Sequence, residues 1–291
     1  MNAILLIPVR LLVLTIVYFV CFIIVSGALL STATGQTATD TKTTLIALLV
    51  ASFINAAILA YIILRSRWTG LKLILTIFVV LFGVMTLMSQ IETAYFVSLP
   101  SGMLPRLFIA GGIIAAIYAP LAVLILGKAK ARGTNSRWQN KLQLSTGHWI
   151  FRLAVIVIAY VLIYFIFGYY VVWKNPAVRS YYGGTDPGTF IAHMANVVRE
   201  TPGLLLLQVL RALLWTAIAI PVIQMMRGAW SESGLAVALL FAVLMNTQLL
   251  LPNPLMPTEV RMAHLLEIIT SNFLFGWLLV AVLLLGRRRV H

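Results

Sequence analysis

Long apolar runs, separated by short polar stretches, divide the chain into eight segments. Each run is about 20 residues long, which is the length of helix that crosses the hydrocarbon core of a bilayer. The runs lack the alternation of membrane strands, and a helix satisfies its own backbone hydrogen bonds within lipid. The pattern therefore predicts an all-α fold, a polytopic transmembrane helical bundle. The expected spans are 10–30, 43–64, 73–96, 107–126, 150–173, 203–226, 234–251 and 260–285, of which 234–251 is the weakest.

The composition agrees with lipid as the main environment of the chain. Hydrophobic residues make up 62% of the 291 positions and charged residues only 10%, proportions that exclude an ordinary soluble domain. The net charge of +14 comes from basic residues at the ends of the apolar runs. Basic residues at those places indicate the orientation of the spans and contact anionic lipid headgroups. We therefore expect a lipid bilayer as partner and no nucleic acid.

The distribution of Lys and Arg predicts the orientation. With the N and C termini in the cytoplasm, fourteen basic residues fall on the inner side and six on the outer side, which is the arrangement that the positive-inside rule favours. Most acidic residues lie outside or in the outer half of the spans. The chain also lacks Asn-X-Ser/Thr sites. Together these features favour a multi-pass protein of the plasma membrane, of the prokaryotic inner-membrane type.

The chain resembles itself when it is shifted by 142 positions. The shift aligns Arg10 and Tyr18 with Arg152 and Tyr160, and apolar positions between them also match. We therefore expect two related halves of four spans each, 1–126 and 149–291, joined by a basic cytoplasmic linker at 127–148. Because four is an even number, the halves would be in parallel orientation, related by an axis along the membrane normal.

Arg211 lies inside the sixth span, where a guanidinium cannot lose its charge and must face protein, water or a carboxylate. Glu267, in the last span, lies eight residues inward from the outer end of its helix, as Arg211 does. At 1.5 Å per residue both groups lie about 12 Å below the outer boundary. We therefore expect an Arg211–Glu267 ion pair, with Gln208 on the same face as Arg211.

Further polar groups gather in the outer half of the bundle. In the last span Arg261, His264 and Glu267 share one arc with Ser271 and Asn272. Glu92 belongs to a polar stripe near the outer end of the third span. Asn246 and Gln248, in the seventh span, would lie about 160° apart on an α-helix, so only one of them could face a cavity. The predicted substrate-binding set is Arg211, Glu267, His264, Glu92, Gln208 and Arg261.

The loop between the fifth and sixth spans contains a second pattern. Residues 188–200 have an apolar arc and an opposite polar arc, which predicts an amphipathic helix lying on the outer leaflet. His193 and Arg199 lie on its polar arc. They are candidates for a lid over the outer cavity, and a packed surface loop is the alternative.

These groups support more than one function. We favour binding or transport of a small solute or lipid with an anionic group, with Arg211 attracting the anion and Glu267 as its resting counter-ion. An intramembrane enzyme remains open, a hydrolase or lipid-modifying enzyme using Glu267 and His264, or a metal held by His264, Glu267, Glu92 and His193. A structural subunit of a membrane complex is the third alternative. No cofactor is expected, and the sequence leaves the oligomeric state open.

Overall fold

The computed structural model describes residues 3–30, 41–130, 141–252 and 256–285, and all its regular elements are helical. Three short π-helical turns (η1 to η3) and one 3-10 helix (η4) continue or interrupt the α-helices. The elements are α1 (Ala3–Leu30), α2 (Thr41–Arg65), α3 (Gly70–Phe82), η1 (Gly83–Leu87), α4 (Met88–Phe96), α5 (Met103–Ile125), α6 (Thr146–Phe167), η2 (Gly168–Trp173), α7 (Pro176–Tyr182), α8 (Phe190–Glu200), α9 (Pro202–Met225), α10 (Trp230–Leu239), η3 (Leu240–Leu244), η4 (Met245–Leu250) and α11 (Thr258–Leu284).

In the part of the chain that is described, eight helical stretches are long and apolar enough to cross a membrane. They coincide with the eight predicted runs, which confirms the all-helical class and makes the chain compatible with an integral membrane protein. The seventh stretch, predicted to be the weakest, extends over Trp230–Leu250 and changes from α to π to 3-10 geometry on the way. The orientation of the termini and the relation between the halves stay predictions.

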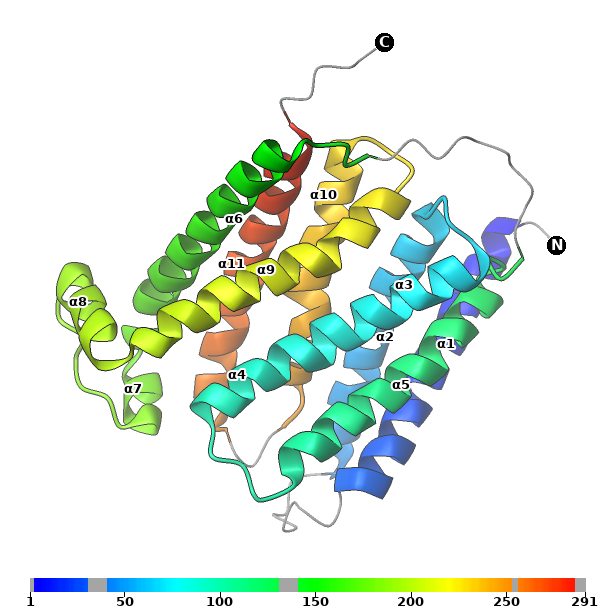
Figure 1. Cartoon of the computed structure of the whole chain (residues 1–291). Helices are drawn as coiled ribbons and strands as arrows, with labels where there is room; N and C mark the ends of the chain where they lie inside the picture. Colours follow the sequence, from blue (N-terminus) through cyan, green and yellow to red (C-terminus); the bar gives the residue numbers. More distant parts are fainter. Residues whose placement is uncertain (1–2, 31–40, 131–140, 253–255, 286–291) are drawn as a thin grey trace. The chain divides into compact units, whose positions relative to one another are not determined.

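The chain forms two compact units. The first unit contains Met1–Trp138, Met225–Gly228 and Val243–Pro254, and the second contains Gln139–Gln224, Ala229–Ala242 and Leu255–His291. In the first unit α1 packs against α2 and α5, and α3 packs against α5. Figure 1 shows α1, α2 and α5 running side by side. The 3-10 helix η4 also belongs to this unit and contacts α2 and η1.

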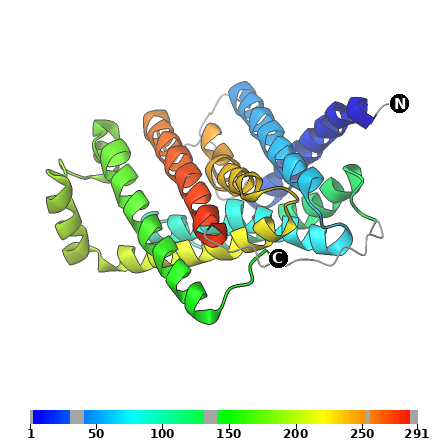
Figure 2. The same cartoon turned by 90° about the horizontal axis from the view of Figure 1, so that it is seen from above.

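In the second unit α11 is the central helix. It packs against α10 on one side and α6 on the other, as Figure 2 shows. The lower turns of α6 continue into η2, and η2 and α7 both contact α11. A small apolar cluster of Val172, Val178, Val260 and Ala263 fixes these contacts. The loop before α9 is thereby anchored to the first turns of α11.

The two arginines that the internal alignment pairs make the same kind of contact in their own units. Arg10, on α1, donates from Nη1 to the carbonyl of Leu126 just past the end of α5 (3.5 Å). Arg152, on α6, donates to the carbonyls of Val282 (2.6 Å) and Leu285 (3.3 Å) at the end of α11. A cation at a helix C-terminus satisfies carbonyls that lack an intrahelical donor.

The paired tyrosines behave alike too. The ring of Tyr18 meets the ring of Tyr118 on α5 edge-on at 5.1 Å, and the ring of Tyr160 lies 4.7 Å from that of Phe275 on α11. In each unit the first span therefore contacts the last span through an arginine and, eight residues later, through an aromatic ring. The duplication of the halves stays a prediction.

Two glycines let helices α10 and α11 approach closely. A Cβ atom on Gly276 would lie 2.6 Å from the Cα atom of Ala238, and one on Gly234 would lie 2.5 Å from the ring of Trp277. The first clash is the more severe, because backbone atoms of a packed helix cannot move aside as a side chain can. By contrast, a Cβ on Gly27 of α1 would meet nothing within 4 Å.

We expect Gly276→Ala to destabilise the protein by roughly 1–3 kcal/mol, the usual cost of overpacking, despite the better helix propensity of alanine. Gly27→Ala makes the same chemical change in open space and should leave the stability unchanged or slightly higher. Thermal unfolding in detergent measures both. Equal effects of the two substitutions would contradict the close approach of α10 and α11.

Candidate functional site

Arg211 is buried within the second unit, on the face of α9 that also carries Gln208. Its side chain is only 3% exposed, and its Nη1 donates to Oε1 of Gln208 at 3.2 Å. The guanidinium carbon lies 5.9 Å from the centre of the Tyr160 ring, which is within cation–π range. The predicted placement of Gln208 beside Arg211 is therefore confirmed, and Tyr160 is an additional neighbour that the sequence did not indicate.

A continuous aromatic layer starts at Tyr160, the ring beside this arginine. Tyr160 contacts Phe275, Phe275 stacks on Phe241 at 6.1 Å, and Phe241 lies 4.1 Å from the ring of Trp215. These rings come from α6, α11, η3 and α9, so four segments of the second unit converge there. Aromatic walls exclude water, and a low local dielectric strengthens the attraction between the guanidinium and any anion.

The same face of α9 carries two buried hydrogen-bond donors with unused capacity. Gln208 and Trp215 are seven residues apart, with Arg211 between them. Among the described residues, neither the Nε2 atom of Gln208 nor the Nε1 atom of Trp215 has an acceptor. Leaving a buried donor unpaired costs about 1–3 kcal/mol. The face therefore offers amide and indole N–H groups on either side of a cation, an arrangement suited to oxygen atoms of an anionic group.

Glu267 and His264 lie on α11 and contact each other. Nδ1 of His264 is 4.0 Å from Oε2 of Glu267, which is 7% exposed. Nε2 of the same histidine lies 3.1 Å from the hydroxyl of Tyr182, at the end of α7. Arg211 and Glu267 are thus both buried in the second unit, and the ion pair between them stays a prediction.

The other two members of the predicted set lie toward the ends of their own spans. Arg261 is buried in the first turn of α11, where its Nη2 donates to Oγ1 of Thr258 at 3.4 Å. Glu92 lies on α4 and belongs to the first unit. Its membership of a site shared with Arg211 stays a prediction.

The first unit contains a polar network around Met85 that the sequence analysis did not assign. Gln248 donates to the Met85 carbonyl at 2.8 Å, and the hydroxyl of Tyr18 donates to its sulfur at 3.1 Å. Nearby, the hydroxyl of Thr247 donates to Oδ1 of Asn55 at 2.9 Å. Met85 lies in the π-turn η1, whose wider winding frees carbonyl groups from the α-helical pattern. Gln248 therefore has the interhelical role usual for amides in membrane helices.

The 160° separation expected between Asn246 and Gln248 does not apply, because both lie in the 3-10 helix η4. At three residues per turn, positions two apart are separated by roughly 120°. Asn246 is buried in the first unit. Met85 and Gln248 both lie where a span leaves α-helical geometry, in η1 and η4.

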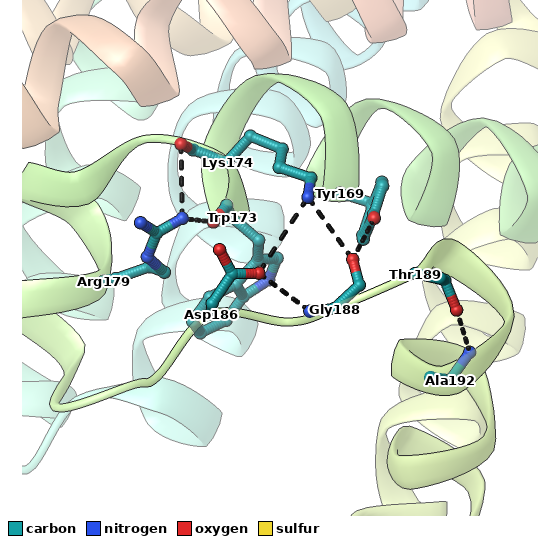
Figure 3. Close-up of polar contacts among 8 residues, drawn as sticks. All are labelled: Tyr169, Trp173, Lys174, Arg179, Asp186, Gly188, Thr189 and Ala192. Carbon is teal, nitrogen blue, oxygen red and sulfur yellow. Dashed lines mark hydrogen bonds and ion pairs between the residues drawn. The ribbon is translucent and has the colours of Figure 1, made fainter.

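A compact cap of polar contacts follows η2, and Figure 3 shows it. Nζ of Lys174 lies 4.0 Å from Oδ1 of Asp186 and donates to the Gly188 carbonyl at 3.3 Å. Asp186 accepts from the N–H of Gly188, and this hydrogen bond, followed by the nearby Lys174 and Arg179, lowers the pKa of the Asp186 carboxyl. Tyr169 also donates to the Gly188 carbonyl. Asp186 and Gly188 are thus tied to η2 and to Lys174, which follows it.

The helix α8 occupies the segment that was expected to be amphipathic, with Thr189 as its N-cap. The two lid candidates differ in exposure. His193 is partly buried against Tyr169 and Trp173, with ring centres 5.7 and 5.9 Å away, and burial lowers its pKa. These ring contacts hold His193 against η2, and its role as a lid residue stays a prediction. Arg199 is exposed at the other end of the helix.

The described residues contain no group of three or more His, Cys, Asp or Glu side chains placed to hold a metal ion. Comparisons with protein-family models, curated proteins and solved structures give no match. The site must therefore be interpreted from its own geometry.

The lowered pKa of His193 predicts that attachment of α8 depends on pH. The neutral imidazole is the form that packs against Tyr169 and Trp173, so this contribution is present above the ordinary histidine pKa of about 6.5 and is lost as the pH falls below it. Amide hydrogen exchange in α8, corrected for its intrinsic pH dependence, should rise on acidification. A His193→Phe variant should lose this pH response, and an equal response in that variant would contradict the prediction.

Proposed function

We propose that this chain is a membrane protein that binds and transports a small solute or lipid bearing an anionic group, and that Arg211 binds that group. The observation that carries the proposal is the buried face of α9, where the guanidinium lies between the donors of Gln208 and Trp215. All three side chains donate. An anion with two or more oxygen atoms is the chemical partner that uses them together.

The surroundings of Arg211 support selective binding of an anion over a neutral molecule. Gln208 orients the guanidinium by accepting from one of its nitrogens, and the Tyr160 ring lies next to the guanidinium. The aromatic layer formed with Phe241 and Phe275 suits the apolar part of a lipid or organic acid. Glu267 would be the counter-ion of Arg211 in the empty state, and an arriving anion would replace it.

Movement of the helices would be needed for transport. Pro120 and Pro221 lie inside α5 and α9, and proline within a membrane helix produces a kink at which the helix can bend. His264 connects this movement to the outer cap, because it contacts both Glu267 and Tyr182. Displacement of Glu267 would thereby shift His264 and, through it, Tyr182 at the end of α7.

A second candidate is an intramembrane hydrolase or lipid-modifying enzyme. One observation favours it: Tyr182, His264 and Glu267 form a chain of adjacent ionisable groups, as general acid–base catalysis requires. In this case Arg211 would hold the substrate anion and His264 would transfer protons. His264→Gln would then abolish turnover without weakening the binding of an anion.

The first test measures anion binding by the purified protein. Acetate, inorganic phosphate and decanoate serve as probes, with the thermal unfolding midpoint as readout. At least one probe should raise the midpoint, since a ligand at a hundredfold excess over its Kd stabilises by about 2.7 kcal/mol. Arg211→Gln should lose this rise, and Arg106→Gln, which removes the same charge from the first unit, should keep it. No rise with any probe for the unaltered protein would argue for a structural subunit.

The second test separates a functional Arg211 from a structural one. If Arg211 and Glu267 form an ion pair, Arg211→Met alone should destabilise the protein by roughly 3–5 kcal/mol, because it leaves the buried Glu267 carboxylate without a counter-charge. The double variant Arg211→Met/Glu267→Gln should recover most of that stability. The stable double variant should still fail to respond to the anion probe. Recovery of the anion response in the double variant would refute a binding role for Arg211.

A further inference from the structure

Basic side chains gather at one end of the first unit around the backbone carbonyl of Ser66, between α2 and α3. Nζ of Lys128 donates to this oxygen at 2.8 Å, and Nε of Arg227 donates to it at 3.1 Å. The two cationic nitrogens are therefore at most about 6 Å apart, a distance at which like charges repel. We call Arg65, Arg67, Lys72, Lys128 and Arg227 the Ser66 cluster.

The backbone around the cluster is held by hydrogen bonds between segments distant in sequence. The N–H of Arg67 donates to the carbonyl of Met225 at 2.7 Å, and the N–H of Arg227 donates to that of Arg65 at 3.2 Å. These two bonds flank an antiparallel bridge between Ser66 and Met226. The positions of the arginines are thus set by paired backbone, as in a preorganised binding site.

A third segment is tied to the same place. The N–H of Gly70 donates to the carbonyl of Lys128 at 2.9 Å. Gly70 has a φ of +60°, and a Cβ there would lie 3.3 Å from the carbonyl of Ala129. The hydroxyl of Ser66 accepts from the N–H of Trp68 and completes the turn. The ends of α2, α5 and α9 and the start of α3 therefore meet at the cluster.

The cluster carries a large excess of positive charge. Its five members are all basic, and Arg65, Lys72 and Arg227 are exposed. The acidic residues of the first unit are Asp40 and Glu92. Asp40 lies outside the described residues, and Glu92 lies near the other end of the third span. Partial burial lowers the pKa of the Arg67 guanidinium. A phosphate group at this position would interact favourably with several cations of the cluster at once.

An exposed apolar stripe runs from the cluster along α3. Leu71, Leu75 and Val79 are 70%, 54% and 45% exposed, and their spacing of four residues places them on one face of the helix. Nζ of Lys72 lies 3.9 Å above the Trp68 ring at the start of this stripe. A tryptophan and a lysine at the end of an apolar helix are typical of the headgroup level of a bilayer. The cluster thus combines cations at headgroup level with an apolar surface leading into the membrane.

We propose that the Ser66 cluster binds the phosphate of an anionic membrane phospholipid, whose acyl chains lie along Leu71, Leu75 and Val79. Basic groups at helix ends attract anionic headgroups, and guanidinium groups bind phosphate oxygens in pairs. This site is separate from that of Arg211 and does not depend on it. Lys128 comes from the basic linker at 127–148, and its hydrogen bond to Ser66 makes it part of the proposed site.

Native mass spectrometry of the protein released from nanodiscs of phosphatidylglycerol and phosphatidylcholine tests the proposal. The unaltered protein should retain phosphatidylglycerol in preference to phosphatidylcholine. Lys128→Gln/Arg227→Gln should reduce that preference roughly tenfold or more, given what two basic residues contribute near an anionic surface. The matched control is Lys42→Gln/Arg106→Gln, which removes one lysine and one arginine from the opposite ends of α2 and α5. It should keep the preference.

Three outcomes would overturn the proposal: equal retention of both lipids by the unaltered protein, an unchanged preference in the folded cluster variant, or an equal loss in the control. If the cluster variant does not fold, Lys72→Gln replaces it, because that exposed side chain lies outside the backbone pairing. It should reduce the preference severalfold, and an unchanged preference would overturn the assignment. Inorganic phosphate is added to separate the two sources of the anion, and its complete displacement of phosphatidylglycerol would assign the cluster to a free phosphate instead.

Discussion

The structure depends on the cost of a permanent charge in a low-dielectric interior. The guanidinium of Arg211 keeps its proton under all physiological conditions, so it needs polar neighbours wherever α9 crosses the bilayer. The second unit meets this need with Gln208 beside it and the Tyr160 ring next to it. The Tyr160 ring contacts Phe275, and ring contacts continue from there to Phe241 and Trp215.

The same constraint operates on neutral backbone groups. Where the third span changes to a π-turn, the carbonyl of Met85 receives the amide of Gln248 from a distant part of the chain. Where α5 and α11 end, Arg10 and Arg152 satisfy carbonyls that have no partner within their own helices. These three side chains therefore lie at interruptions and ends of helices, where backbone groups lack a partner within their own helix.

The two binding sites that we propose differ in exposure. Arg211 is buried beside the Tyr160 ring, which favours a ligand with one anionic end and an apolar body. The Ser66 cluster is open, and its arginines and lysines are ordered by backbone pairing between Ser66 and Met226. A buried cation selects ligands by shape as well as charge, whereas an exposed group of cations selects them mainly by charge. The two proposed sites would therefore bind different ligands.

The sequence by itself determined the helical class, the eight apolar spans, the pairing of Gln208 with Arg211 and the repeated Arg10 and Arg152 positions, because hydropathy and helical periodicity are local properties. Only the tertiary structure decided which side chains from different segments meet. It placed Tyr182 against His264, turned His193 toward Tyr169, and brought Lys128 and Arg227 to one carbonyl 62 and 161 residues away in sequence. Such contacts depend on helix packing and on local π and 3-10 geometry, which shift the direction of every following side chain and leave no periodic signal in the sequence.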